Sequence, residues 1–175
     1  MNQPKTHRIF FALNPDDRVR REVLAVQQGC GIEGRALPPA NFHVTLAFLG
    51  MQETGVISRV CEIADTLSFQ PCEVVLDRVG RFKRAGVLWL GASNIPESLV
   101  AFQHGLVSAL LEAGIGYDRK PWKLHLTLYR KMRKAPYIMD PVEVRWRLNG
   151  FSLVESVSVN RGVDYHEIGC WKACR

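Results

Sequence analysis

The stretch HVTLAFLG occupies positions 43–50, and a second stretch, HLTLYR, occupies positions 125–130. Both are rich in apolar, β-branched and aromatic residues, so each predicts a strand. Their histidines lie close to half the chain length apart. Each stretch also follows a predicted strand and a predicted helix, so the same order of elements occurs twice. This repetition predicts an internal duplication, approximately 1–86 and 87–175.

The rest of the sequence predicts an α+β fold in a single two-lobed domain. A chain of 175 residues most simply forms one compact unit, and no flexible linker separates its halves. Strands are expected at 8–13, 42–49, 72–79, 87–91, 123–129, 142–148, 151–159 and 163–171, and helices at 14–29, 54–67 and 96–113. The two His-x-Thr-Leu strands should be central and face one cleft.

Capping and turn residues predict where several elements end. Asn14 is the expected N-cap of the first helix, with Pro15 at its first helical position and Gly29 near its end. Gly50 is expected to end the strand of the first motif. Gly86 follows the basic segment RFKRA and favours a hairpin there.

The spacing within each motif points to acid–base chemistry. Side chains alternate across a strand, so His43 shares a face with Thr45, and His125 shares a face with Thr127. One imidazole can remove a proton from a nucleophile while the other protonates a leaving oxygen, because histidine titrates near neutral pH. Threonine hydroxyls can donate hydrogen bonds to the oxygens of a phosphate. These residues predict a phosphoesterase.

The two histidines have two other interpretations. A single histidine on a strand is usually packed or at the surface, but two copies in matching halves favour a functional pair. A zinc site usually needs three or four ligands. Neither strand offers a second ligand two or four residues away on the same face, so no metal site is expected.

Arg130 and the basic loops are weaker candidates for phosphate contacts. Strict alternation would turn the Arg130 side chain away from His125, whereas a strand irregularity at Tyr129 would bring it back. The loops at 81–84 and 130–134 fit either an RNA backbone or ordinary solvated charge.

The other candidate aromatic residues and histidines lie outside the repeated motif. Phe42 and Tyr129 flank the motifs and fit either stacking on a base or packing in the core. His7, His104 and His166 lack a repeated context and are expected at the surface.

Composition favours a cytoplasmic protein with an anionic ligand. The formal net charge is +6, and cationic side chains attract phosphates. The chain has five cysteines, an odd number, and no CxxC motif. This pattern argues against a disulfide framework and favours reduced thiols. No signal peptide or membrane span of roughly 20 apolar residues is expected. With no long exposed apolar pattern, a monomer is expected.

Together these stretches resemble the 2H phosphoesterase superfamily, and within it the group of bacterial RNA 2',3'-cyclic phosphodiesterases, also called 2'-5' RNA ligases (the ThpR or LigT group). RIFFALNP at 8–15, NFHVTLAFLG at 41–50 and VLWLG at 87–91 resemble segments of that group, as do the two motifs. The resemblance implies two pseudo-symmetric antiparallel sheets with outer helices around a central cleft. It also implies hydrolysis of 2',3'-cyclic phosphate RNA ends, such as those of tRNA fragments, to 2'-phosphomonoesters without metal or cofactor.

The resemblance further implies roles for the motif residues. His43 would be the proton donor to the leaving 3'-oxygen and His125 the proton acceptor that activates water. Thr45 and Thr127 would hold the phosphate oxygens. The near-symmetry of the motifs leaves the donor and acceptor roles interchangeable on sequence alone. The stretch VDYHEIGCW at 163–171 departs from the group, as does the basic stretch after Arg130.

Three alternatives remain open from the sequence. The same residues could catalyse 2'-5' RNA ligation, in which a ribose hydroxyl replaces water. A module that binds RNA or nucleotide ends without turnover would need the basic loops but not both histidines. A cyclic phosphodiesterase for a small nucleotide would differ in the size of its cleft.

Overall fold

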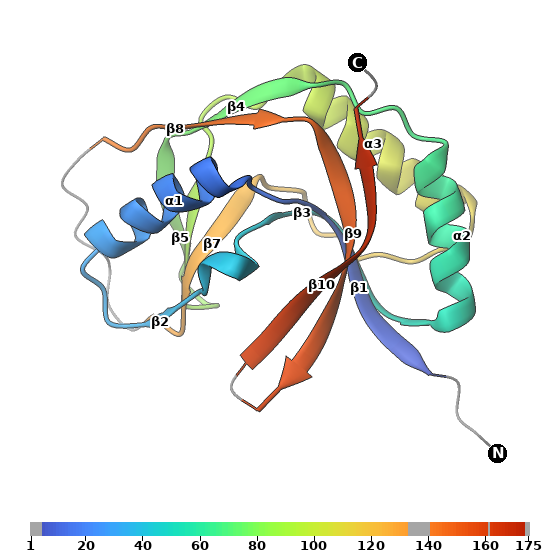
Figure 1. Cartoon of the computed structure of the whole chain (residues 1–175), viewed down its shortest axis with the longest axis horizontal. Helices are drawn as coiled ribbons and strands as arrows, with labels where there is room; N and C mark the ends of the chain where they lie inside the picture. The colour runs from blue at the N-terminus through green and yellow to red at the C-terminus, as the bar shows by residue number, and fades with distance from the viewer. Residues whose placement is uncertain (1–4, 133–140, 161, 174–175) are drawn as a thin grey trace.

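A computed structural model describes residues 5–132, 141–160 and 162–173 of the chain (Figure 1). The strands are β1 (Thr6–Leu13), β2 (Arg35–Ala36), β3 (Val44–Glu53), β4 (Cys72–Leu76), β5 (Arg78–Phe82), β6 (Val87–Gly91), β7 (His125–Arg130), β8 (Val144–Leu148), β9 (Gly150–Val159) and β10 (Gly162–Lys172). The helices are α1 (Asp17–Gly29), α2 (Thr54–Asp65), α3 (Glu97–Glu112) and the short 3-10 helix η1 (Pro39–Asn41). The predicted α+β class is confirmed.

The sheets are antiparallel. The larger one has the order β10-β9-β1-β3-β7-β6-β5, with β2 paired to β7, and a separate two-stranded sheet joins β4 to β8. Strands β3 and β7 meet at a single pair, Val44 with Leu126. The large sheet therefore consists of two antiparallel halves joined at this pair, as the resemblance implied.

The repeated order of elements can be followed in the structure. The first repeat contributes β1-α1-β3 and the second β6-α3-β7. Each motif strand pairs with the first strand of its own repeat, β3 with β1 and β7 with β6. The helices cross over: α3 packs against β3, and Gln27 of α1 donates to the carbonyl of Leu128 in β7 at 2.7 Å. The internal duplication stays a prediction.

Helix α1 starts two residues later than the capping signals suggested. Asp16, rather than Asn14, is the N-cap, and its carboxylate accepts a hydrogen bond from the Val19 amide at 2.8 Å. Pro15 therefore precedes the cap instead of occupying the first helical position. Asn and Asp cap equally well, so the sequence did not distinguish them.

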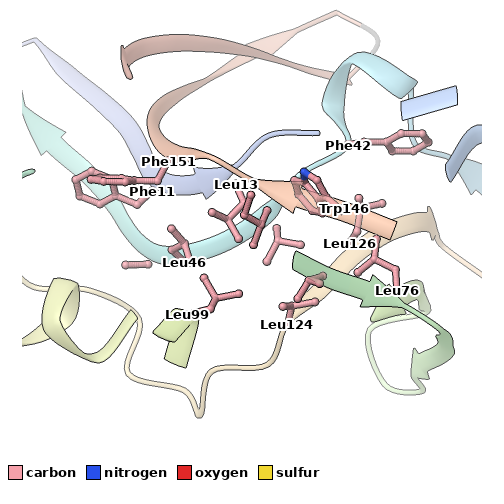
Figure 2. Close-up of a cluster of buried hydrophobic side chains, with 14 of the residues drawn as sticks. Phe11, Leu13, Phe42, Leu46, Leu76, Leu99, Leu124, Leu126, Trp146 and Phe151 are labelled. Atoms are coloured by element: carbon pink, nitrogen blue, oxygen red, sulfur yellow. The ribbon is translucent and has the colours of Figure 1, made fainter. Parts of the chain in front are cut away.

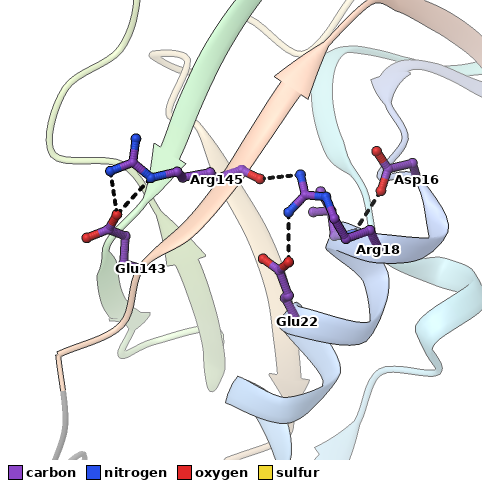
Figure 3. Close-up of polar contacts among 6 residues, drawn as sticks. Asp16, Arg18, Glu22, Glu143 and Arg145 are labelled. Carbon is purple, nitrogen blue, oxygen red and sulfur yellow. Dashed lines mark hydrogen bonds and ion pairs between the residues drawn. The ribbon is translucent and has the colours of Figure 1, made fainter.

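Arg18 ties the start of α1 to the small sheet (Figure 3). Its guanidinium donates to the Arg145 carbonyl of β8 at 2.8 Å and to the Glu22 carboxylate at 2.7 Å. Arg145 in turn donates to Glu143 at 3.0 Å. The exposed ion pairs add little stability, but the bond to the backbone fixes the helix beside β8.

One large apolar core lies between the sheet and the helices (Figure 2). Its labelled members come from strands far apart in sequence, among them Phe11 of β1, Leu46 of β3, Leu126 of β7 and Phe151 of β9. On the opposite face of β1, Phe10 and Ala12 form a small second cluster with Val154. That face carries the first motif histidine.

Strand β3 runs past the residue expected to end it. Gly50 lies inside β3 at φ 73° and beside a register shift against β1. A glycine adopts this left-handed conformation easily, so the strand bulges instead of stopping. The hairpin predicted at Gly86 is confirmed, because β5 pairs with β6 directly across that turn. The single strand predicted at 72–79 was wrong, since β4 is separate from β5 and pairs with β8.

Among the described residues, no helix is both long enough and apolar enough to cross a membrane. Four cysteines are free thiols: Cys30, Cys61, Cys72 and Cys170. Cys174 lies outside the described residues.

Candidate active site

The pair of Val44 with Leu126 brings the two motifs together at the middle of the large sheet. The strands are antiparallel, so this register sets His43 opposite Thr127 and Thr45 opposite His125. Directly opposed side chains on one face are neighbours. The charge of His125 also lowers the pKa of His43. The four motif residues therefore share one site.

Each motif histidine is held by the carbonyl two residues before it. His43 Nδ1 lies 2.7 Å from the Asn41 oxygen, and His125 Nδ1 lies 2.8 Å from the Lys123 oxygen. A carbonyl can only accept, so each Nδ1 carries the hydrogen. In the neutral ring, Nε2 is then the nitrogen with the free lone pair. Both imidazoles have the same tautomer.

The segment before His43 is braced from two sides. Asn41 donates through its side-chain amide to the Val163 carbonyl of β10 at 2.8 Å. Arg20 of α1 donates to the carbonyls of Pro39 and Pro15 at 2.7 and 2.9 Å. These bonds fix the carbonyl that orients His43.

Aromatic rings and a cavity surround His43. Phe10 lies with its ring centroid 4.9 Å from that of His43, and Tyr165 of β10 meets the imidazole edge-on at 5.0 Å. A cavity of about 280 Å³ opens beside these rings. Two of its other lining residues, Asn14 and Glu167, are polar.

The surroundings of His125 are aromatic and cationic. Phe82 of β5 packs edge-on against the imidazole at 5.1 Å. Lys123 Nζ lies 4.1 Å from the centroid of the Trp89 ring and 5.5 Å from that of Phe82. The Trp89 ring lies against Gly80, where an added Cβ would come within 2.2 Å of the ring. A glycine is therefore required at that position.

Burial and nearby cations keep both imidazoles neutral. The pKa of His43 is lowered from 6.5 to about 4, mainly by burial and also by the charges of Arg130 and His125, against a raising effect from the Asn41 carbonyl. Burial also lowers the pKa of His125, followed by the charges of Lys123 and Arg130. At neutral pH the unliganded site holds two neutral histidines.

A strand irregularity lies just before Arg130. The pairing of β6 with β7 shifts between Leu88 and Trp89, so that Leu128 of β7 has no opposite residue. Such a bulge interrupts the alternation of side chains. The Arg130 charge then acts on the pKa of both His43 and His125.

Phe42 and Tyr129 belong to the core rather than to the site. Phe42 is 1% exposed, and the Tyr129 hydroxyl donates to the Gln27 carbonyl at 3.0 Å. Stacking of these two rings on a base is thereby excluded. The aromatic rings beside the histidines are instead Phe10, Tyr165 and Phe82, on strands whose positions relative to the motifs depend on the fold.

The remaining candidates lie at the surface, with one exception. Lys83, Arg84 and Lys131 are exposed, and residues 133 and 134 lie outside the described residues. His104 and His166 are exposed as predicted. His7 is not: its Nδ1 donates to the Glu155 carboxylate at 2.6 Å, and its side chain is only 13% exposed. In the part of the chain that the structure describes, no three His, Cys, Asp or Glu side chains are grouped to bind a metal.

Comparison with known proteins places the chain in a family. An RNA 2',3'-cyclic phosphodiesterase of Archaeoglobus fulgidus is 30% identical over 173 residues, which cover 92% of this chain and 97% of that protein. The chain belongs to the LigT-like phosphoesterase family. The model of this family, described as LigT like Phosphoesterase, matches residues 13–89. A family member from Escherichia coli, also an RNA 2',3'-cyclic phosphodiesterase, is 27% identical over 81% of this chain and 80% of its own length.

Two solved structures share the fold. The crystal structure of E. coli LigT with 3'-AMP superposes with a TM-score of 0.89 at 23% identity, covering 98% of this chain and all of that one. The Thermus thermophilus protein TT0787 gives a TM-score of 0.81 at 24% identity over 94% of this chain and 97% of its own. The bilobal fold of the LigT-like family is thus confirmed for the whole described chain.

Proposed function

We propose that this protein is an RNA 2',3'-cyclic phosphodiesterase that hydrolyses the cyclic phosphate to a 2'-phosphomonoester. The observation that carries the proposal is the pairing of the two motifs. Two imidazoles with the same tautomer share one site, and each lies opposite the threonine of the other motif. The names of the relatives from A. fulgidus and E. coli support the same reaction.

In this mechanism His125 is the proton acceptor and His43 the proton donor. Nε2 of His125 takes a proton from water as the water oxygen attacks phosphorus. The bond from phosphorus to O3' breaks, and O3' takes the proton carried by Nε2 of His43. The phosphate remains on O2'. The cycle closes when His125 releases its extra proton to solvent and Nε2 of His43 takes up a proton from solvent.

Thr45, Thr127 and Arg130 hold the phosphate. The threonine hydroxyls donate to its non-bridging oxygens, and the guanidinium offsets the charge that builds on them. Acid, base and oxyanion donors all come from side chains, so these steps require no metal or cofactor.

The substrate itself prepares the proton donor. Both pKa values are lowered in the unliganded site, so in the free enzyme at neutral pH His43 is neutral and Nε2 carries no proton. A bound anionic phosphate favours the charged imidazolium and raises both pKa values. The donor therefore becomes protonated when the substrate binds.

The test is to incubate the purified protein, in excess EDTA, with a short RNA that ends in a 2',3'-cyclic phosphate. We expect a 2'-phosphate end, identified by chromatography and phosphatase sensitivity. A folded protein that binds this RNA without turnover would instead be an end-binding module. Adding an acceptor RNA with a 5'-hydroxyl separates hydrolysis from 2'-5' ligation, because ligation joins the two RNAs. The cytoplasmic location and the monomeric state stay predictions.

A further inference from the structure

The cavity beside His43 has features of a nucleobase site. Its volume is about 280 Å³, and Tyr165 and Phe10 give it aromatic walls. Asn14 and Glu167 line the same space and supply polar groups. Tyr165 and Glu167 both come from β10.

The chemistry of the proposed reaction sends the terminal nucleoside toward this cavity. The leaving O3' belongs to the ribose of the last nucleotide, so that ribose must lie on the side of the proton donor. His43 is that donor and lines the cavity. Water attacks from the opposite side of phosphorus, next to His125. The base attached to the ribose therefore extends toward Tyr165 and Glu167.

The Glu167 carboxylate is fixed in place and keeps one oxygen available. Oε2 accepts a hydrogen bond from the buried Ser152 hydroxyl at 2.6 Å and another from the Asn14 amide at 3.2 Å. Within the described residues, no hydrogen bond involves Oε1. The pairing of β10 with β9 shifts just after Glu167, so the strand is irregular there.

We propose that this cavity binds the 3'-terminal nucleobase of the RNA and that Glu167 makes guanine preferred over uracil. The proposal rests on the function proposed above. A carboxylate accepts from the N1–H and the amino group of guanine, which point the same way. Uracil has a single N3–H flanked by two carbonyl oxygens, and the oxygen nearest the carboxylate is repelled.

Two neighbours complete the site. Arg20 lines the same cavity, and its guanidinium has five N–H groups. Nη1 and Nη2 each donate to a backbone carbonyl. A further N–H is available for O6 of guanine. The Tyr165 ring gives an apolar surface against which a base can pack, as aromatic side chains do in single-strand RNA recognition.

The experiment compares kcat/KM for four short RNAs that differ only in the last nucleotide before the 2',3'-cyclic phosphate. We expect the wild type to favour guanosine over uridine by at least about tenfold, the range of one good bidentate contact. In Glu167→Gln the amide can both donate and accept, so this ratio should fall about tenfold. Glu112→Gln, which removes an exposed carboxylate at the end of α3, is the matched control and should keep the wild-type ratio.

Binding of product analogues provides a second measurement that does not depend on turnover. Guanosine 2'-monophosphate should bind the wild type about tenfold more tightly than uridine 2'-monophosphate, and Glu167→Gln should bind both equally. Equal kcat/KM for all four RNAs, or an unchanged ratio in Glu167→Gln, would overturn this inference and leave the proposed function intact. No turnover of any of the four RNAs would overturn the proposed function, and this inference with it.

Discussion

Val44 of β3 is paired with Leu126 of β7 at the junction between the two halves of the large sheet. Because β3 and β7 are antiparallel, this pair sets each motif histidine opposite the other motif's threonine. The site is therefore assembled by the pairing of two strands, and both side chains are buried in the core beneath it.

The pH dependence of kcat/KM should be displaced toward acid. Catalysis needs one protonated and one neutral imidazole, and the pKa values of both His43 and His125 lie below 6.5 in the free protein. Above pH 6.5 the fraction of enzyme in which one of the two imidazoles is positively charged falls about tenfold per pH unit. The kcat/KM optimum is thus expected below pH 6.5, measured with a cyclic phosphate RNA. A value that rises steadily up to pH 8 would rule out this protonation scheme.

The same burial should make the fold sensitive to acid. The His43 pKa is about 4 in the folded protein and near 6.5 when unfolded, so the unfolded chain binds more protons between these values. Stability should fall as pH decreases from 6.5 to 4, by up to about 3 kcal/mol from this group. Denaturant melts of wild type and His43→Gln test this. Equal pH dependence in the two proteins would show that His43 does not contribute.

Removing either threonine hydroxyl should slow the chemical step more than it weakens binding. Thr127→Val and Thr45→Val keep the side-chain shape but lose the donor to the phosphate oxygens. We expect kcat to fall by about 10²-fold in each, the usual cost of one oxyanion donor. Steady-state kinetics on the same RNA provide the measurement. A change confined to KM would mean that the hydroxyls only bind the ground state.

Tyr129→Phe should lower stability and spare catalysis. The Tyr129 hydroxyl donates to the Gln27 carbonyl and attaches α1 to β7. Losing this bond should cost about 1 kcal/mol in the free energy of unfolding. The kcat/KM should stay within about twofold of wild type. A tenfold loss of kcat/KM with unchanged stability would place Tyr129 in the site after all.

The elements of the fold could be predicted because their signals are local. Helical spacing of Leu99, Phe102 and Leu106 predicted α3, and each is buried in the structure. The exact start of α1 could not be predicted, because Asn14 and Asp16 are equally good N-cap residues. The crossing of the helices onto the opposite motif strands depends on packing between distant segments, which no local pattern encodes.

The candidate site, like the fold, has a part that local sequence predicts and a part that depends on contacts between distant segments. The spacing of His43 and Thr45, repeated at His125 and Thr127, predicts these four residues as candidates from the sequence alone. The rings beside them come from β1, β5 and β10, so only the folded chain reveals Phe10, Phe82 and Tyr165 as neighbours. Asn41 and Lys123 act through their backbone carbonyls, which side-chain type does not indicate.

The most direct test of the paired histidines is the single-turnover rate of His43→Ala, His125→Ala and the double variant on an RNA with a 2',3'-cyclic phosphate end. Each single variant should lose about 10³-fold or more, within the range for a general acid or base. The double variant should be little worse than either one, because the two groups act in one step. Circular dichroism and RNA binding would show that the variants are folded. A single variant that keeps the wild-type rate would contradict the account.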